Sequence, residues 1–149
     1  MFIKREELFD GISADARGVI ERHKTKQTYR EGELVFQEGE EAHYFYMLED
    51  GKVDLVVGEP RETRFLAYYP GEIFGWSALV KPHRYLAQAR CMTTSTISRV
   101  PVEAIVRIIK DYPSDGVLIY RNLGGILGQR LIAAYRDRQA EPDTAAYGG

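Results

Sequence analysis

Between residues 28 and 101 the chain is divided into short segments by glycine-containing turns about ten residues apart. Within the segments apolar side chains alternate with polar ones, and this period of two is typical of strands with one buried face. Strands this short and this regularly spaced predict a sandwich or barrel of antiparallel strands. The turn signals are Glu31-Gly32, Glu38-Gly39-Glu40, Asp50-Gly51 and Pro70-Gly71.

A helical segment precedes the strands. Residues 5–25 carry apolar side chains at helical spacing, with an interruption at Asp10-Gly11. Ser13 follows the interruption and is a natural N-cap, because its hydroxyl can accept a hydrogen bond from an N–H of the first helical turn. The N-terminal part is therefore expected to be a small helical unit.

Two further helices are expected after the strands. Apolar residues repeat with a helical period over residues 102–109, until Pro113 ends that helix. Ser114 can cap a second helix that runs to about Arg138 and is apolar over more than one face. That helix is long for a small domain, so part of its apolar surface needs a partner.

Gly124, Gly125 and Gly128 lie inside the long helix, where each glycine costs about 1 kcal/mol relative to alanine. Three explanations remain open from the sequence. The glycines can let another backbone pack closely, such as a second copy of the same helix; they can form a hinge; or they can break the segment into two shorter helices.

Composition restricts the protein's class and its surroundings. A chain of 149 residues with a net charge of −2 fits one ordinary domain and lacks the basic excess of a dedicated nucleic-acid binder. The single cysteine, Cys91, cannot form an internal disulfide. No charged-then-apolar leader follows Met1, and no apolar run is long enough to cross a bilayer. We therefore expect a cytoplasmic protein without a membrane segment.

The chain contains no pattern typical of an enzyme or a metal site. Its histidines, His23, His43 and His83, are scattered and form no His-x-His pair. Cys91 lies inside a predicted strand, where a buried, inert thiol is expected. A Ser-His-Asp arrangement, a P-loop and a dinucleotide fingerprint are all missing from the sequence. We expect no catalytic residue, no metal and no required cofactor.

Residues 70–87 have the composition of an anion pocket. Gly75 would let a ligand approach the backbone, and the N–H groups of a helix that starts there would carry partial positive charge. Arg84 would add a cation with a fork geometry suited to phosphate. The same residues also fit a plain turn followed by a buried edge.

In order and spacing, these pieces resemble the cyclic nucleotide-binding domain of bacterial catabolite-activator-type regulators, protein kinase A regulatory subunits and nucleotide-gated channels. The resemblance covers residues 5–138. It rests on Leu8-Phe9 with Gly11, on Tyr29-Arg30-Glu31-Gly32-Glu33-Leu34-Val35-Phe36, on Glu38-Gly39-Glu40 followed by Ala42, Tyr46, Leu48, Gly51 and Val53, and on Pro70-Gly71-Glu72-Ile73-Phe74-Gly75.

The resemblance implies a mainly β fold with flanking helices, namely a double-stranded, jelly-roll-like β-roll followed by a short and a long C-terminal helix. It also implies that the stretch around Gly75 is the phosphate-binding cassette. The expected domain spans residues 1–139, with helices at about 5–25, the β-roll at about 28–101, C-terminal helices at about 102–139 and a disordered tail at 140–149.

The cassette departs from the family's pattern at two places. Members that bind cyclic nucleotides usually have a glutamate directly after Phe-Gly, to accept from the ribose 2′-hydroxyl, and here Trp76 can only donate. Binders then have arginine, serine or threonine, and alanine, whereas this chain has one extra residue between Arg84 and Ala87. Counted back from Ala87, Tyr85 takes the arginine's place; with a one-residue bulge, Arg84 can still serve.

These departures leave the ligand open. Loss of one charge-assisted partner in a buried site costs about 1.5–3 kcal/mol, which is one to two decades in affinity. We expect the site either to bind cyclic AMP, cyclic GMP or a related anion, with altered or weakened nucleotide specificity, or to be plugged by an apolar Trp76. Tyr135 is a candidate base cap from the long helix. The expected ligand-binding residues are Phe74, Gly75, Trp76, Ser77, Ala78, Arg84, Tyr85, Leu86, Ala87 and Tyr135.

The resemblance implies a stand-alone, ligand-sensing regulatory module, expected to be a homodimer through the face of Gly124, Gly125 and Gly128. One alternative is a ligand-free dimerisation or protein-docking module with a decayed pocket. Another is the effector domain of a transcription regulator that lacks its own DNA-binding part. About ten unpatterned residues follow Gln139, too few for a winged helix-turn-helix, so we expect no direct DNA binding.

Overall fold

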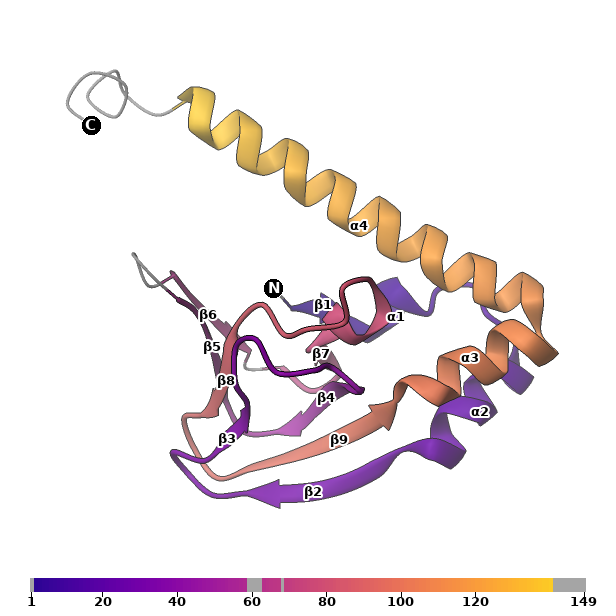
Figure 1. Ribbon diagram of the computed structural model, residues 1–149, viewed down its shortest axis with the longest axis horizontal. Helices are drawn as coiled ribbons and strands as arrows, with labels where there is room; N and C mark the ends of the chain where they lie inside the picture. The colour runs from indigo at the N-terminus through magenta and orange to yellow at the C-terminus, as the bar shows by residue number, and fades with distance from the viewer. Residues whose placement is uncertain (1, 59–62, 68, 141–149) are drawn as a thin grey trace.

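The computed structural model describes residues 2–58, 63–67 and 69–140. Figure 1 shows a roll of strands with two helices at one end and a long helix that passes over the N-terminal segment. The helices are α1 (Arg5–Leu8), α2 (Ala14–His23), a 3-10 helix η1 (Trp76–Leu79), α3 (Val102–Asp111) and α4 (Pro113–Ala140). The strands are β1 (Ile3–Lys4), β2 (Thr25–Tyr29), β3 (Leu34–Phe36), β4 (Tyr44–Asp50), β5 (Val53–Val57), β6 (Thr63–Ala67), β7 (Glu72–Phe74), β8 (Gln88–Cys91) and β9 (Ser95–Pro101).

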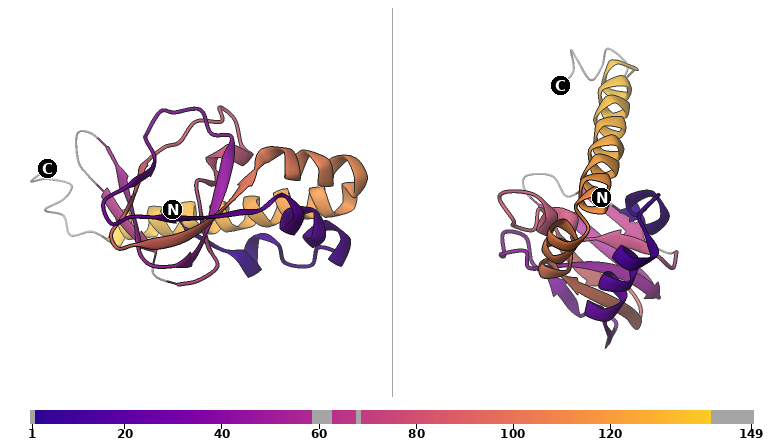
Figure 2. Two further views of the ribbon diagram at one scale, coloured as in Figure 1. Left: turned by 90° about the horizontal axis from the view of Figure 1, so that it is seen from below. Right: turned by 90° about the vertical axis from the view of Figure 1, so that its right-hand side faces the viewer.

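The strands form two sheets with antiparallel pairing throughout the described residues. One sheet has the order β1-β7-β4-β9-β2, and the other has the order β3-β8-β5-β6. This arrangement confirms the predicted β-roll with its short and long C-terminal helices. The right-hand view in Figure 2 shows α4 rising away from the strands to one side.

Strand β4 shows how one alternating sequence builds two hydrophobic cores. Phe45 and Met47 face the helices and belong to a core that also contains residues of α2, α3 and α4. Tyr46 and Leu48 face the opposite way, into the space between the two sheets. Successive side chains of a strand point to opposite faces, so β4 separates the helical core from the core of the roll.

Two sequence-based expectations about helix ends have different outcomes. Ser13 is the N-cap of α2, as predicted, and its hydroxyl accepts a hydrogen bond from the Ala16 N–H at 3.2 Å. The expectation that Ser114 caps the long helix is wrong, because α4 already begins at Pro113. Proline suits the first position of a helix, where its missing N–H and its restricted φ do no harm.

Helix α4 is continuous through the glycines, so the alternative of two shorter helices is also wrong. Strand β1 was not predicted. It is only two residues long and exists because Ile3 pairs with Ile73 of β7. The predicted disordered tail begins at residue 140, but Ala140 is the last residue of α4, and residues 141–149 lie outside the described residues. None of the described helices is long and apolar enough to cross a membrane.

Side chains of α4 hold the N-terminal segment in place. The Asp115 carboxylate accepts from the Ser13 N–H at 2.9 Å and from its hydroxyl at 2.6 Å. The Asn122 amide donates to the carbonyls of Leu8 and Asp10 at 3.0 and 2.9 Å. Further along the helix, Arg130 donates to the carbonyl of Phe2. The start of α4 is therefore fixed to the domain by polar contacts as well as by its apolar face.

We expect Asn122→Ala to lower the free energy of unfolding by about 1–3 kcal/mol, because it removes two hydrogen bonds to backbone carbonyls, of which the one to Leu8 is partly shielded from water. Urea unfolding followed by circular dichroism measures the change. Gln129→Ala is the control, since Gln129 is an exposed residue of the same helix without a side-chain hydrogen bond to the described residues. Equal stability of the two variants would contradict the role of Asn122.

Candidate functional site

The centre of the candidate site is the turn from β7 into η1. Gly75 links the two with φ 70°, a left-handed conformation that glycine adopts without strain. A Cβ at this position would lie 3.1 Å from the rings of Phe36 and Tyr46 and 3.3 Å from the ring of Tyr85. Both the backbone conformation and the close approach of aromatic rings therefore require glycine here.

Four aromatic side chains fill the interior of the roll beside Gly75. The rings of Phe36 and Tyr85 are stacked, with centroids 3.8 Å apart and an interplanar angle of 12°. Tyr46 stacks on Phe74 at 5.5 Å and lies 5.6 Å from Phe36. We call Phe36, Tyr46, Phe74 and Tyr85 the aromatic cluster. It comes from β3, β4, β7 and the segment before β8, so it joins both sheets.

Tyr85 is held in this cluster both by burial and by a hydrogen bond to the backbone. It is 4% exposed, and its hydroxyl donates to the carbonyl of Tyr44 at 2.7 Å. Burial raises the pKa of Tyr85 above its usual value, and burial together with the neighbouring Tyr85 raises the pKa of Tyr46. Both phenols therefore stay neutral at physiological pH, and the interior of the cluster carries no charge of its own.

The cluster leaves almost no space beside the cassette. The cavity there has a volume of about 10 Å³, and its lining residues are Phe36, Leu55, Gly75, Trp76, Ser77, Tyr85, Leu86 and Ala87. A cavity must have a volume of about 10–15 Å³ to hold a single water molecule. In the conformation described, the place that the sequence predicts for a ligand is filled by the chain's own side chains.

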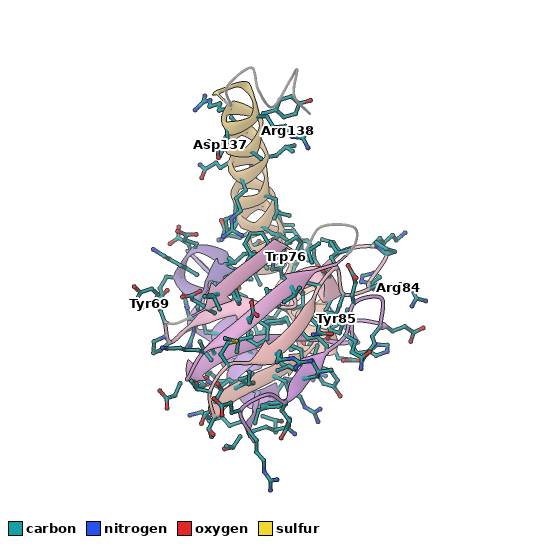
Figure 3. The ribbon with its side chains drawn as sticks, turned by 90° about the vertical axis from the view of Figure 1, so that its left-hand side faces the viewer. Tyr69, Trp76, Arg84, Tyr85, Asp137 and Arg138 are labelled. Atoms are coloured by element: carbon teal, nitrogen blue, oxygen red, sulfur yellow. The ribbon has the colours of Figure 1, made fainter. Side chains whose placement is uncertain are left out.

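The structure separates the two residues that compete for the arginine's place. Tyr85 points into the roll, whereas Arg84 is exposed and donates to the carbonyl of Gly39 at 3.0 Å. Figure 3 shows Arg84 extending outward at the edge of the roll, beside Tyr85. A bridge between Glu41 and Arg84 sets this register. Arg84 therefore does not line the cavity in this conformation.

Trp76 lies in the other core. It is 9% exposed and packs mainly with residues of the helical core, such as Leu79 of η1 and Ile105 of α3. Figure 3 shows it below the base of α4. One edge of Trp76 still borders the small cavity. Tyr85, rather than Trp76, is the residue that fills the site, and Trp76 connects the cassette to the helices.

The remaining predicted site residues are divided between the site and the surface. Ser77, Ala78 and Ala87 are buried beside the cassette, while Leu86 is half-exposed. Tyr135 is 64% exposed on the part of α4 that extends beyond the domain. It is fifteen residues beyond Tyr120, which is about 22 Å along the helix axis. Within one chain the structure does not bring Tyr135 to the cassette.

Sequence analysis missed the contact between the cassette and α4. The Tyr120 hydroxyl donates to the carbonyl of Leu79, the last residue of η1, at 2.9 Å. This hydrogen bond links the end of η1 directly to α4. Phe36 belongs to the family pattern in the sequence but was not predicted to be a site residue. The structure places its ring beside Gly75, where it lines the site. No spacing in the sequence indicates either contact.

The described residues also limit the chemistry. They contain no cluster of three or more His, Cys, Asp and Glu side chains that could hold a metal ion. Cys91 is buried between the sheets, and burial raises the pKa of its thiol. A thiol that stays protonated is a poor nucleophile.

Comparisons with known proteins give one family and one fold. The family model described as "Cyclic nucleotide-binding domain" matches residues 26–112, more than half of the chain. Among curated proteins, the chain is 27% identical to Glutaminase 1 of Bradyrhizobium diazoefficiens over 132 residues, which are 89% of this chain and 21% of that protein. It is 25% identical to the Cyclic AMP receptor protein of Thermus thermophilus over 136 residues, which are 89% of this chain and 60% of that protein.

Among solved structures, the Catabolite Activator Protein of Thermus thermophilus matches with a TM-score of 0.73 and 24% identity. The match covers 89% of this chain and 62% of that chain, and at this identity it concerns the fold alone. The chain thus spans about a fifth of the glutaminase and less than two thirds of the receptor protein. What each of these proteins does as a whole is not carried over by these matches.

We expect Tyr85→Ala to lower the free energy of unfolding by about 3–5 kcal/mol, because it leaves a cavity in the centre of the aromatic cluster. Tyr85→Phe keeps the ring and loses only the hydrogen bond to Tyr44, so it should cost about 1 kcal/mol. Thermal and urea unfolding measure both. Leu86→Ala, at a half-exposed neighbour, is the control. A Tyr85→Ala variant as stable as Leu86→Ala would show that the ring is not packed as described.

Proposed function

The chain belongs to the cyclic nucleotide-binding domain family, and from that premise we propose that it is a regulatory module that pairs through α4 while Tyr85 closes its nucleotide pocket. We propose one domain over residues 1–139, without enzymatic activity and located in the cytoplasm, where a buried free thiol such as Cys91 stays reduced. The observation that carries the proposal is the filled cavity beside Gly75.

The chemistry of the cassette supports a closed pocket. A cyclic nucleotide brings a charged phosphate and a ribose, and the lining of the cavity contains no charged side chain. Arg84, which could pair with a phosphate, is outside the cavity. To enter, a nucleotide would have to displace the stacked Tyr85 ring and break its hydrogen bond to Tyr44. We propose that cyclic AMP and cyclic GMP therefore bind weakly, in the millimolar range or above.

A second candidate function, ligand sensing, is favoured by a different observation. The backbone of Gly75 and η1 keeps the form of an anion-binding turn, and Tyr120 connects η1 to α4. A ligand that opened the cluster would then act on α4 through this link. Such a module requires a ligand whose affinity differs between two states of the helix.

The outer face of α4 supports pairing with a second copy. Val117, Gly124, Gly128, Leu131 and Tyr135 fall within about 60° of one another around a helix of 3.6 residues per turn. The three large side chains of this stripe are all more than half exposed. Nothing lies within 4 Å of a Cβ placed on either glycine, so another backbone can approach closely there. An apolar stripe on a helix that extends into solvent is typical of a helix that pairs.

Gly125 does not belong to this stripe. It lies about 100° away from Gly124 around the helix axis. Instead it borders a groove of about 730 Å³ between α1 and α4, whose walls include Glu6 and Arg121. We therefore narrow the expected pairing face from three glycines to Gly124 and Gly128. The net charge of −2 gives the chain no basic excess, so we propose no direct binding to DNA.

Calorimetric titration with cyclic AMP and cyclic GMP separates the two candidate functions. The closed pocket predicts no saturable heat for either nucleotide below millimolar concentration, because Tyr85 must first leave the cluster. Arg84→Ala should behave like the unchanged protein. Submillimolar binding that Arg84→Ala weakens by about tenfold or more would overturn the closed pocket in favour of ligand sensing.

We expect Leu131→Glu to convert the dimer to a monomer, because it buries a charge in the proposed pairing face. Analytical ultracentrifugation measures the change. Gln129→Glu is the matched control. It adds the same charge two residues away, about 200° around the helix, and should leave the dimer intact. A monomer in the unchanged protein at high concentration, or equal effects of the two variants, would refute pairing through this face.

A further inference from the structure

Arg99 of β9 lies on the inner face of the roll, and the sequence analysis did not single it out. In the register of the first sheet it is directly opposite Tyr46 of β4 on one side and Thr25 of β2 on the other. Residues directly opposite in an antiparallel pair have side chains on the same face. Tyr46 belongs to the core between the two sheets, so Arg99 is on the same side of the sheet.

The Arg99 guanidinium is half-buried and has no acidic partner in the described part of the chain. Its central carbon lies 4.5 Å from the centroid of the Tyr44 ring, and this cation–π contact is the interaction found for its charge. No carboxylate among the described residues lies within 4.0 Å of it. A guanidinium carries five N–H donors in a fixed fork, and the ring satisfies none of them in the way an oxyanion does.

The edge strand β2 supplies polar groups beside this cation. Thr25, Gln27 and Tyr29 share the inner face of β2, while Lys26 and Thr28 point to the opposite face. Thr25 and Gln27 are exposed, so this inner-face surface of β2, which we call the shelf, is open to water beside Arg99. The Tyr29 hydroxyl donates to the Gln27 side chain at 2.9 Å, which orients the Gln27 amide. A hydroxyl and an amide next to a guanidinium that has no acidic partner among the described residues are donors suited to an oxyanion.

The charge of Arg99 also acts on the tyrosines that face it across the inner face of the sheet. Burial raises the pKa of Tyr29, and the charge of Arg99 acts in the opposite direction. The same two causes act on Tyr46, with burial the larger. The positive charge of Arg99 therefore acts to lower the pKa of a tyrosine on each neighbouring strand, Tyr29 of β2 and Tyr46 of β4. Glu33 acts on Tyr29 with the opposite sign and is the smallest of the contributions to its pKa.

We infer that Arg99, with Thr25 and Gln27 beside it, binds the oxyanion group of a small molecule on the inner face of β2 and β9. This site is separate from the cavity beside Gly75, which Tyr85 fills, and it does not depend on pairing through α4. It adjoins the closed pocket, because Tyr44 lies under Arg99 and also accepts the hydrogen bond of Tyr85. An anion bound to Arg99 would therefore lie next to Tyr44, whose carbonyl accepts the hydrogen bond that holds the Tyr85 ring in the pocket.

The test is an NMR titration of the full chain with inorganic phosphate, acetate and adenosine monophosphate. Amide signals of residues 25–27 and 97–99 and the Arg99 Nε–H signal report binding. We expect saturable shifts with a millimolar dissociation constant for phosphate. Tighter binding of adenosine monophosphate would identify a nucleotide, and tighter binding of acetate a carboxylate, as the natural source of the oxyanion.

Two pairs of variants decide whether Arg99 is responsible. Arg99→Gln should weaken binding by about tenfold or more, while Arg84→Gln, which removes an exposed arginine at the edge of the roll, should leave it within about twofold. Gln27→Glu places a negative charge on the shelf and should also weaken binding. Thr28→Glu adds the same charge on the other face of β2 and is its control.

The exposed positions 27 and 28 keep the test valid even where Arg99→Gln disturbs the fold. Binding that is lost in Arg99→Gln or Gln27→Glu and kept in Arg84→Gln and Thr28→Glu supports the site. Absence of saturable shifts in the unchanged protein, or equal affinity in Gln27→Glu and Thr28→Glu, overturns it. Neither result depends on the dimer or on cyclic nucleotide binding, so failure of this site and failure of the proposed function are distinguishable.

Discussion

The close packing of three aromatic rings against Gly75 is the interaction on which the rest of the structure depends. The rings come from β3, β4 and the segment before β8, and they meet because residue 75 has no side chain. The residue after Gly75, Trp76, then enters the helical core. Two consecutive residues thus tie the cassette to both cores, and no part of the cassette can shift without disturbing one of them.

The uncharged character of these rings has a consequence for ligand binding. Aromatic rings fill the interior, and the residues that line the cavity offer no charged side chain to a phosphate. Positive charge is present nearby, but it is displaced to Arg84 on the outside and to Arg99 on the inner face of the sheet. The chain keeps the backbone of an anion site and distributes its cations elsewhere.

Much of the fold could be predicted from local patterns. The alternation along β4 predicts a strand, and Ser13 predicts a helix start, because both depend on near neighbours. Strand β1 could not be predicted, since two residues form a strand only through pairing with β7. Ser114 was assigned as a cap because proline was read as the end of one helix and not as the start of the next.

The candidate site was harder to predict because it depends on register. The sequence narrows the arginine's place to residues 84 and 85. The choice is made by the bridge to Glu41 and by the hydrogen bond from the Ala42 N–H to the His83 carbonyl at 2.7 Å. These partners are more than forty residues away, beyond any local pattern. Arg99 did carry a signal, because it has the same alternation phase as the buried Ile97, but its neighbours on β2 and β4 are known only from the pairing.

The part of α4 beyond Gly128 has a consequence of its own. The residues from 129 to 138 are exposed, so burial against the domain adds little to their stability beyond the hydrogen bond from Arg130 to the Phe2 carbonyl. A helix of this length is marginal in water on its own, below the roughly 12–15 residues that isolated helices need. Any free energy gained by pairing is therefore also free energy for helix formation. In the proposed dimer, order in this segment and association of two chains would be a single equilibrium, and the amount of helix would then report the local concentration of the protein.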